Sequence, residues 1–360
     1  MSTTIGQYGG DGASIILNAA IDNITLQQQQ NSWQTSAGTL AETYAGVGDS
    51  RQTAISLNPK ITQVASWQTN ITNTQTNLSI TDTTMKQIVS LAQTLSTSLT
   101  SVTGTSSATA VATVVEQAKG LLSELGTALN TQSGSTYIFA GQDGTEAPVT
   151  DASNIGSSTM ATTIASAVSG LTDSNVDSVL AAATTAASSN TAGTSVFSSN
   201  LSVSATTAAS LQASVVMSTT SSKVGLVATQ SSTTSSASST STGSPIRDLM
   251  SDLMVVASMG GMSSETPGYT DLVTKLNTSL NTTVGQLTDM EAQVGVQQSA
   301  LTTRSTMLAS VTTMLKTQLS DARDADAASA ITATTTLKTQ LEASFTLVAD
   351  MKNMSLASYL

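Results

Sequence analysis

The stretch Leu57–Leu99 reads LNPKITQVASWQTNITNTQTNLSITDTTMKQIVSLAQTLSTSL. An apolar residue recurs there at every seventh position: Leu57, Val64, Ile71, Leu78, Met85, Ala92 and Leu99. A seven-residue apolar repeat of this length is typical of a helix that packs along another long helix. We therefore predict one continuous helix over about residues 52–102.

A second ribbon of the same kind lies toward the other end of the chain. Its stripe, again spaced by seven, is Val273, Leu280, Leu287, Val294, Leu301, Leu308 and Leu315, and it predicts a helix over about 271–319. The intervening core-type positions are partly polar, with Thr74 and Thr81 in the first ribbon and Gln297 and Arg304 in the second. Such residues weaken a self-sufficient two-stranded coil. We therefore expect the two ribbons to pair with each other and then with neighbouring copies.

Further helices are predicted on either side of the ribbons. Apolar spacing indicates helices over about 13–44 and 327–360, with a Gly-containing break at 46–50 and a charged joint at 321–326. The Gly-rich residues 1–14 are expected to be flexible in isolation. Pro59 is expected in the first turn of its helix, where proline is tolerated.

The middle of the chain has a different composition. Helices are expected over about 108–133 and 246–256, and the short run Tyr137–Phe139 between Gly-bearing turns predicts a strand. Between them, residues 142–243 form an insert rich in Ser, Thr, Ala and Gly. Within that insert we expect a short helix near Ile164–Leu171 and a strand over Val196–Val203.

The end of the insert is its most biased segment. From Thr229 to Thr242, 12 of 14 residues are Ser or Thr. A segment with no apolar period is expected to be a loop or an extended, solvated arm.

Composition excludes several classes of function. Only 10% of residues are charged, the formal net charge is -11, and the few basic residues form no cluster, which excludes a nucleic-acid partner. The chain has no Cys and no His, so we expect no catalytic residue, metal site or cofactor. No apolar run is long enough for a membrane span, and no conventional secretory signal is present. Sparse charge suits a surface that becomes buried against copies of itself.

Three sequence features resemble the bacterial flagellin family. Paired helical ends enclose a variable Ser/Thr-rich middle. The segments Gln318–Asp326, Leu341–Phe345 and Met354–Leu360 are similar to the family's C-terminal pattern. Gly134–Gly141, which reads GSTYIFAG, is closer to the hook-filament junction proteins of that family. The N-terminus lacks the family's usual Asn-Thr-Asn start.

The resemblance implies a mainly α fold, with long coiled-coil-like helices from both termini and a variable, partly β outer insert. It implies an N-terminal inner-tube helix, a helical core domain in two halves, the insert, and a C-terminal inner-tube helix, with these parts at 1–46, 47–141, 142–244, 245–320 and 321–360. It further implies a non-enzymatic, extracellular subunit of the bacterial flagellum that forms a helical homopolymer. The implied partners are an export chaperone, the type III export apparatus, and the hook-junction and cap proteins.

The apolar residues of the terminal helices are the candidate assembly interface. A helix face that offers Leu, Ile, Val and aromatic residues at helical spacing can be buried against neighbouring copies. The candidates are Leu17, Ile21, Ile24, Trp33, Leu40, Ile331, Leu341, Phe345, Val348 and Leu360. We expect the two terminal arms to be poorly ordered in the monomer and ordered in the polymer.

Four other interpretations remain open. The chain can be a hook-filament junction protein, which Tyr137–Gly141 favours, rather than a filament flagellin. The same stripes can serve an autonomous four-helix bundle. A catalytic protein would need a site that a chain without His and Cys hardly offers. An adhesin or a phage fibre would be expected to show β-repeats or trimeric heptads.

Overall fold

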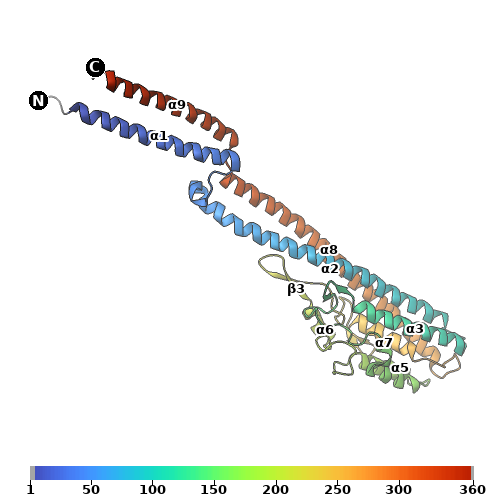
Figure 1. The fold of residues 1–360 in the computed structure, drawn as a ribbon. Helices are drawn as coiled ribbons and strands as arrows, with labels where there is room; N and C mark the ends of the chain where they lie inside the picture. The colour runs from blue at the N-terminus through green and yellow to red at the C-terminus, as the bar shows by residue number, and fades with distance from the viewer. Residues whose placement is uncertain (1–4, 358–360) are drawn as a thin grey trace. The chain divides into compact units, whose positions relative to one another are not determined.

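The computed structural model describes residues 5–357 (Figure 1), and the chain divides into two compact units. Unit 1 comprises residues 1–66 and 307–360, and unit 2 comprises residues 67–306. The two longest helices, α2 (Arg51–Ser101) and α8 (Tyr269–Arg323), contribute residues to both units. They are the two ribbons expected from the sequence, and the mainly α fold class is confirmed.

The seven-residue stripes form the buried faces of α2 and α8. Every residue of both stripes is buried, from Leu57 to Leu99 and from Val273 to Leu315. The period of seven keeps these side chains on one side of each helix, because 3.6 residues complete a turn. The prediction of two long helices with one buried face each is therefore confirmed.

In unit 2 the two ribbons pair with each other as antiparallel helices. The Asn277 side chain donates to Thr100 Oγ1 at 2.8 Å, and Gln75 donates to Thr302 Oγ1 at 3.2 Å. Between these contacts the Ser96 hydroxyl lies 3.2 Å from the side-chain oxygen of Asn281. Residue numbers fall along α2 as they rise along α8, which identifies each ribbon as the partner of the other end of its own chain.

The polar core-type positions have two different explanations in the structure. Thr74 and Thr81 are buried, and their hydroxyls donate to the carbonyls four residues earlier at 2.7 and 2.8 Å. Gln297 and Arg304 instead hold the insert: Gln297 accepts from the Gly225 amide at 2.8 Å, and Arg304 donates to the Met217 carbonyl at 3.0 Å. The helix carbonyls thus satisfy the buried Thr hydroxyls, whereas Gln297 and Arg304 satisfy backbone groups of the insert.

The core of unit 2 is built around helix α7 (Pro245–Ala257). It packs against α3 (Ala108–Leu129), α4 (Thr159–Ser169) and α5 (Val176–Ala187) (Figure 1). The expected helices near 108–133, 164–171 and 246–256 are confirmed, whereas α5 was not expected. Ser107 and Ser158 are the N-cap residues of α3 and α4. The Ser107 hydroxyl accepts from the Ala110 amide, and the Ser158 hydroxyl accepts from the Ala161 amide.

The strands form three separate two-stranded antiparallel hairpins. They are β1 (Gln132–Ser133) with β2 (Thr136–Tyr137), β3 (Ala213–Val216) with β4 (Ser221–Val224), and β5 (Ala237–Ser238) with β6 (Ser241–Thr242). Short helical turns connect the insert: η2 (Ile155–Ser157), α6 (Ala205–Ala208) and η3 (Ala209–Leu211). The expected strand at Tyr137–Phe139 is present only up to Tyr137, and Phe139 is fully buried.

Two expectations for the insert are wrong. Val196–Val203 is not a strand: it has a single bridge, between Phe197 and Val149, and beyond it the carbonyls of Leu201 and Val203 accept from the buried Arg247. The Ser/Thr-rich arm is not solvated throughout. Thr229 and Gln230 are buried, with the Thr229 hydroxyl on the Leu201 carbonyl at 2.9 Å, and the segment ends in the β5–β6 hairpin.

Unit 1 contains α1 (Ile5–Ala37), η1 (Tyr44–Ser50) and α9 (Ala327–Ala357). Helix α1 begins earlier than expected and ends before Gly38, whose positive φ of 69° favours glycine. Asp326 begins α9, because its carboxylate accepts from the Ala328 amide at 2.9 Å. Pro59 lies inside α2 instead of in its first turn, so that expectation is wrong.

Candidate assembly surfaces

Helices α1 and α9 of unit 1 lie side by side and antiparallel. Their joined ends are tied by backbone hydrogen bonds from Leu40 to the Arg323 carbonyl at 2.8 Å and from Ala325 to the Gly38 carbonyl at 2.9 Å. A bridge between Thr39 and Asp324 sets the direction. The charged joint expected at 321–326 therefore has a defined role in pairing the two arms.

Half-buried apolar residues lie along the sequence-predicted helix faces. Leu17, Ile21 and Ile24 are each half-buried and recur at four- and three-residue spacing along α1. Leu341 of α9 is half-buried as well. Leu337 and Ala330 of α9 are buried on the same heptad-like spacing. This spacing defines one stripe per helix, as two helices packed along their length require.

A second apolar face of α1 stays exposed. Leu26 lies two residues after Ile24, which places it about 200° further round the helix, and 62% of its surface is exposed. Trp33 follows seven residues later on the same face and is also exposed, with its indole N–H donating to Thr39 Oγ1 at 3.0 Å. Ile15 and Ile16 extend the exposed apolar surface toward the start of the helix.

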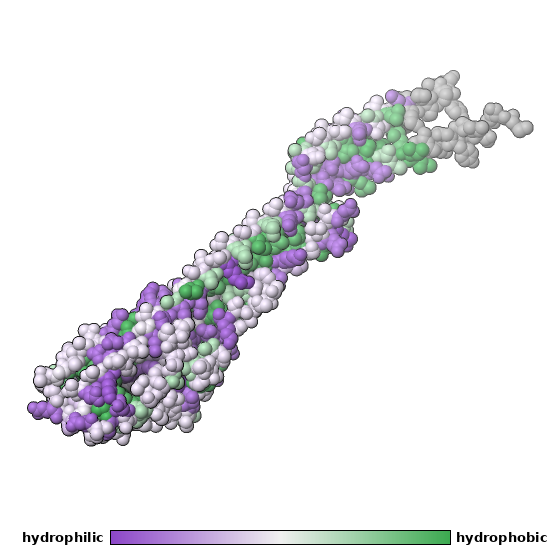
Figure 2. Space-filling view, turned by 180° about the vertical axis from the view of Figure 1, so that it is seen from behind, coloured by the Kyte–Doolittle hydropathy of each residue, from purple (hydrophilic) through white to green (hydrophobic). Residues whose placement is uncertain are grey.

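Helix α9 has exposed apolar residues too. Phe345 is 54% exposed, and Ile331, Leu347 and Val348 are also exposed. Figure 2 shows apolar residues over the described part of this helix pair. Large apolar side chains exposed along one helix pair make this surface a candidate interaction site.

The candidate residues therefore fall into three groups. Leu17, Ile21, Ile24, Leu40 and Leu341 are half-buried within the chain, whereas Trp33, Ile331, Phe345 and Val348 are exposed. Leu360 lies outside the described residues. Ile15, Ile16, Leu26 and Leu347 are not among the residues predicted from the sequence, although the spacing of seven from Leu26 to Trp33 was a signal for Leu26.

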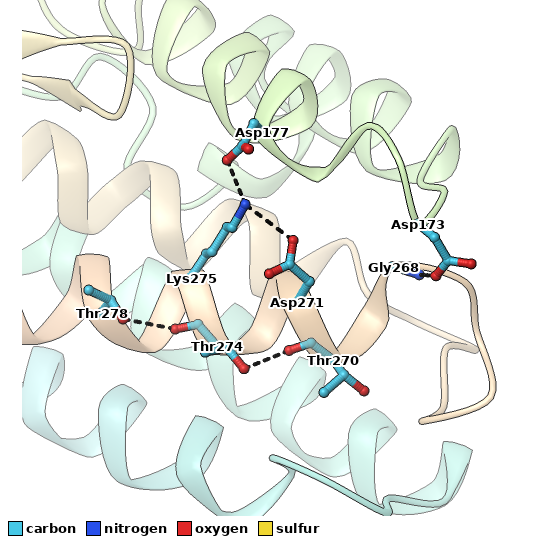
Figure 3. A network of polar contacts seen from close by, with 8 residues as sticks. All are labelled: Asp173, Asp177, Gly268, Thr270, Asp271, Thr274, Lys275 and Thr278. Atoms are coloured by element: carbon cyan, nitrogen blue, oxygen red, sulfur yellow. Dashed lines mark hydrogen bonds and ion pairs between the residues drawn. The ribbon is translucent and has the colours of Figure 1, made fainter.

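Unit 2 differs in that several of its charged side chains are paired or buried. Lys275 of α8 donates to the carboxylates of Asp177 of α5 at 2.7 Å and of Asp271 at 3.2 Å (Figure 3). These hydrogen bonds, first that to Asp177, raise the pKa of the Lys275 ammonium. Asp173 accepts from the Gly268 amide at 2.5 Å. Asp173 and Asp177 thus both hold the insert against the start of α8.

Arg247 of α7 holds the insert through hydrogen bonds. Arg247 is only 2% exposed, and its guanidinium donates to the carbonyls of Leu201 and Val203 and to the side-chain oxygen of Asn190, each at 3.1 Å. The Phe197 ring lies 5.3 Å from the guanidinium carbon, within range of a cation–π contact. Burial lowers the pKa of Arg247 to about 10, so the side chain stays charged at neutral pH.

The described helices include none that is apolar over the length a membrane crossing needs. A search of curated proteins found no match to this chain. Residues 276–360, which include most of α8 and all of α9, match the family model described as the bacterial flagellin C-terminal helical region. This match covers the C-terminal pattern on which the resemblance was based, and residues 276–360 are therefore similar to the C-terminal helical region of bacterial flagellins.

Proposed function

We propose that this chain polymerises into the filament of a bacterial flagellum that drives swimming. The observation that carries the proposal is the second apolar face of the terminal helix pair. Leu26 and Trp33 on α1 and Phe345 on α9 stay exposed although α1 and α9 already contact each other. Such faces can be buried only by something outside the chain, and copies of the chain offer the same faces.

The energetics favour assembly through many weak contacts. Fully burying one large apolar side chain contributes roughly 1.5–3 kcal/mol. The exposed set includes Ile15, Ile16, Leu26, Trp33, Ile331, Phe345, Leu347 and Val348. Because the exposed face of α1 differs in sequence from that of α9, a contact between them is heterologous, and a heterologous contact that does not close produces an open helical polymer.

The remaining parts of the proposal rest on the family resemblance. We propose that residues 1–46 and 321–360 form an inner tube, that 47–141 and 245–320 form a surrounding helical domain, and that the insert 142–244 projects outward. The polymer would lie outside the cell. Its subunits would pass through the type III export apparatus with a chaperone and would meet hook-junction and cap proteins.

The hook-filament junction protein remains the alternative function. The motif Gly134–Gly141 favours it, and the structure gives these residues a packing role: Phe139 is fully buried, and Ala140 bridges to Val227. At Gly141, whose φ is 72°, an added Cβ would lie 2.3 Å from the Leu211 carbonyl oxygen. These constraints explain the motif by local folding, and they serve either function.

Electron microscopy of purified, polymerised chain tests the proposal. A filament subunit is expected to grow fibres whose length increases with protein concentration and time. A junction protein is expected to stop at short rings or caps. Antibody labelling on cells should decorate the whole filament in the first case and a single point at its base in the second. A chain that stays monomeric with seeds and at high concentration would contradict the proposal.

A further inference from the structure

A cavity of about 310 Å³ lies in unit 2 between α5, α7, α8 and the β5–β6 hairpin. Two carboxylates of α7 line it, Asp248 and Asp252, one helical turn apart. Both are buried, and Asp252 is only 7% exposed. Carboxylates so enclosed are rare unless they are paired with a cation or carry a proton.

The two carboxylates have unequal sets of hydrogen-bond donors. Asp248 accepts from the Ser241 hydroxyl at 2.5 Å and from both the amide and the hydroxyl of Thr242 at 2.7 Å. Asp248 thereby fastens the β5–β6 hairpin to α7. Among the described residues only the Ser279 hydroxyl of α8 donates to Asp252, at 3.1 Å. Hydrogen bonds therefore stabilise a negative charge on Asp248 much better than they stabilise one on Asp252.

The charged groups around the cavity do not neutralise Asp252. Lys275 of α8 lines the cavity but is engaged by Asp177 of α5 and by Asp271. Arg247 is held by the carbonyls of the insert, and the β5–β6 hairpin contributes no charged residue. Helix α4 has none either, and Lys119 of α3 lines a separate cavity beside Met254 and Ala257.

We propose that Asp252, beside Asp248, is a proton-binding switch that holds α5 and the β5–β6 hairpin against α7 and α8 while protonated and loosens this packing when the proton is lost. Burial, followed by the neighbouring charge of Asp248, raises the pKa of Asp252 well above its ordinary value. Burial also raises the pKa of Asp248, although its three donors oppose the shift.

The direction of the pH effect follows from linkage. The folded state binds the proton more tightly than the unfolded state, whose Asp pKa is about 3.9. The contribution to stability is therefore fully present below about pH 3.9 and is lost as the pH rises through the folded-state pKa. For one proton, the opening equilibrium constant should rise by up to tenfold per pH unit in that window.

Hydrogen exchange of the full-length monomer, followed by mass spectrometry over a pH series, tests the switch. Peptides covering 176–187 and 237–257 are compared between wild type and Asp252→Asn at each pH, so that the intrinsic pH dependence of exchange cancels. The ratio of wild-type to variant exchange should be constant near pH 4 and should then rise by up to tenfold per unit. A ratio that stays constant across the series would overturn the proposal.

Two further variants keep the test decisive. Glu124→Gln neutralises an exposed carboxylate on α3 of the same unit and should leave the pH dependence of wild type unchanged. If Asp252→Asn does not fold, Ser279→Ala removes the hydroxyl that donates to Asp252. It should increase opening of the same peptides at neutral pH and leave them unchanged near pH 4. Equal opening at every pH would indicate a purely structural role and would reject the switch.

Discussion

Helix α1 of unit 1 and helix α7 of unit 2 are both rich in apolar residues, yet they differ in what surrounds them. Every residue from Pro245 to Val256 of α7 is buried, including two aspartates and an arginine. Helix α1 is covered on one stripe only, and Leu26 on its other face remains exposed. The difference teaches that unit 2 buries its apolar residues within one chain, whereas unit 1 leaves apolar surface exposed.

Charge follows the same division. In unit 2 the insert is held by Lys275 and by the buried Arg247, each with several oxygen partners. The described part of α1 beyond Ser14 carries a single charged residue, Asp22. A surface without charge is poorly suited to staying solvated and well suited to burial, because no ion needs to be desolvated.

The largest effect is expected from a variant that makes the exposed faces polar. Leu26→Asn combined with Phe345→Asn should raise the critical concentration for polymerisation by at least about 100-fold, since each side chain contributes roughly 1.5–3 kcal/mol when buried. Light scattering measures the concentration, and circular dichroism should show unchanged monomer helicity. Gln29→Asn on the exposed surface of α1 is the matched control. Normal polymerisation of the double variant would remove the contrast between the two units.

A variant in the core of α7 should change the stability of unit 2, in contrast to the surface variant of α1 and α9, which should change polymerisation. Leu253→Ala removes a fully buried side chain and should lower the stability of unit 2 by about 2–5 kcal/mol. Urea unfolding followed by near-ultraviolet dichroism of the buried Tyr269 reports it. Val296→Ala, at an exposed site on α8, should change stability by less than about 0.5 kcal/mol. Similar losses for both would mean that the core of unit 2 is not closed.

A smaller effect is expected at the anchor of the insert. Arg247→Met removes the donor from the carbonyls of the buried Leu201 and the half-buried Val203, which should cost about 1–3 kcal/mol per buried group left unpaired. Limited proteolysis should then cut within 187–204 faster than in wild type, while polymerisation should be affected less than by the Leu26 and Phe345 changes. An unchanged cleavage rate would show that other contacts hold this loop.

The smallest effect is expected at the exposed ion pairs in Figure 3. Lys275→Met should shift the unfolding midpoint less than Leu253→Ala does, because solvent screens exposed pairs. Raising the salt concentration should reduce the difference from wild type further. A midpoint shift as large as that of Leu253→Ala would mean that Lys275 also interacts with the carboxylates of the cavity. Added salt would then leave that shift unchanged.

Sequence periodicity predicted the helices well, and it failed where backbone groups find irregular partners. The stripes from Leu57 to Leu99 and from Val273 to Leu315 predicted α2 and α8, because helix packing repeats every seven residues. Val196–Val203 resembles a strand in composition, but Arg247 donates to the carbonyls of Leu201 and Val203. No local sequence rule predicts a contact between residues 44 or more positions apart.

The sequence by itself determined the helical class, the similarity of residues 276–360 to the flagellin C-terminal region, and the amphipathic character of the terminal arms. These properties depend on spacing and composition, which are local. Only the tertiary structure decided which faces are covered: Ile24 lies half-buried while Leu26 is exposed, and Asp252 lies in a cavity enclosed by α5 and the β5–β6 hairpin. Burial is a property of what other segments bring to a residue, so the helix pattern alone could not assign it.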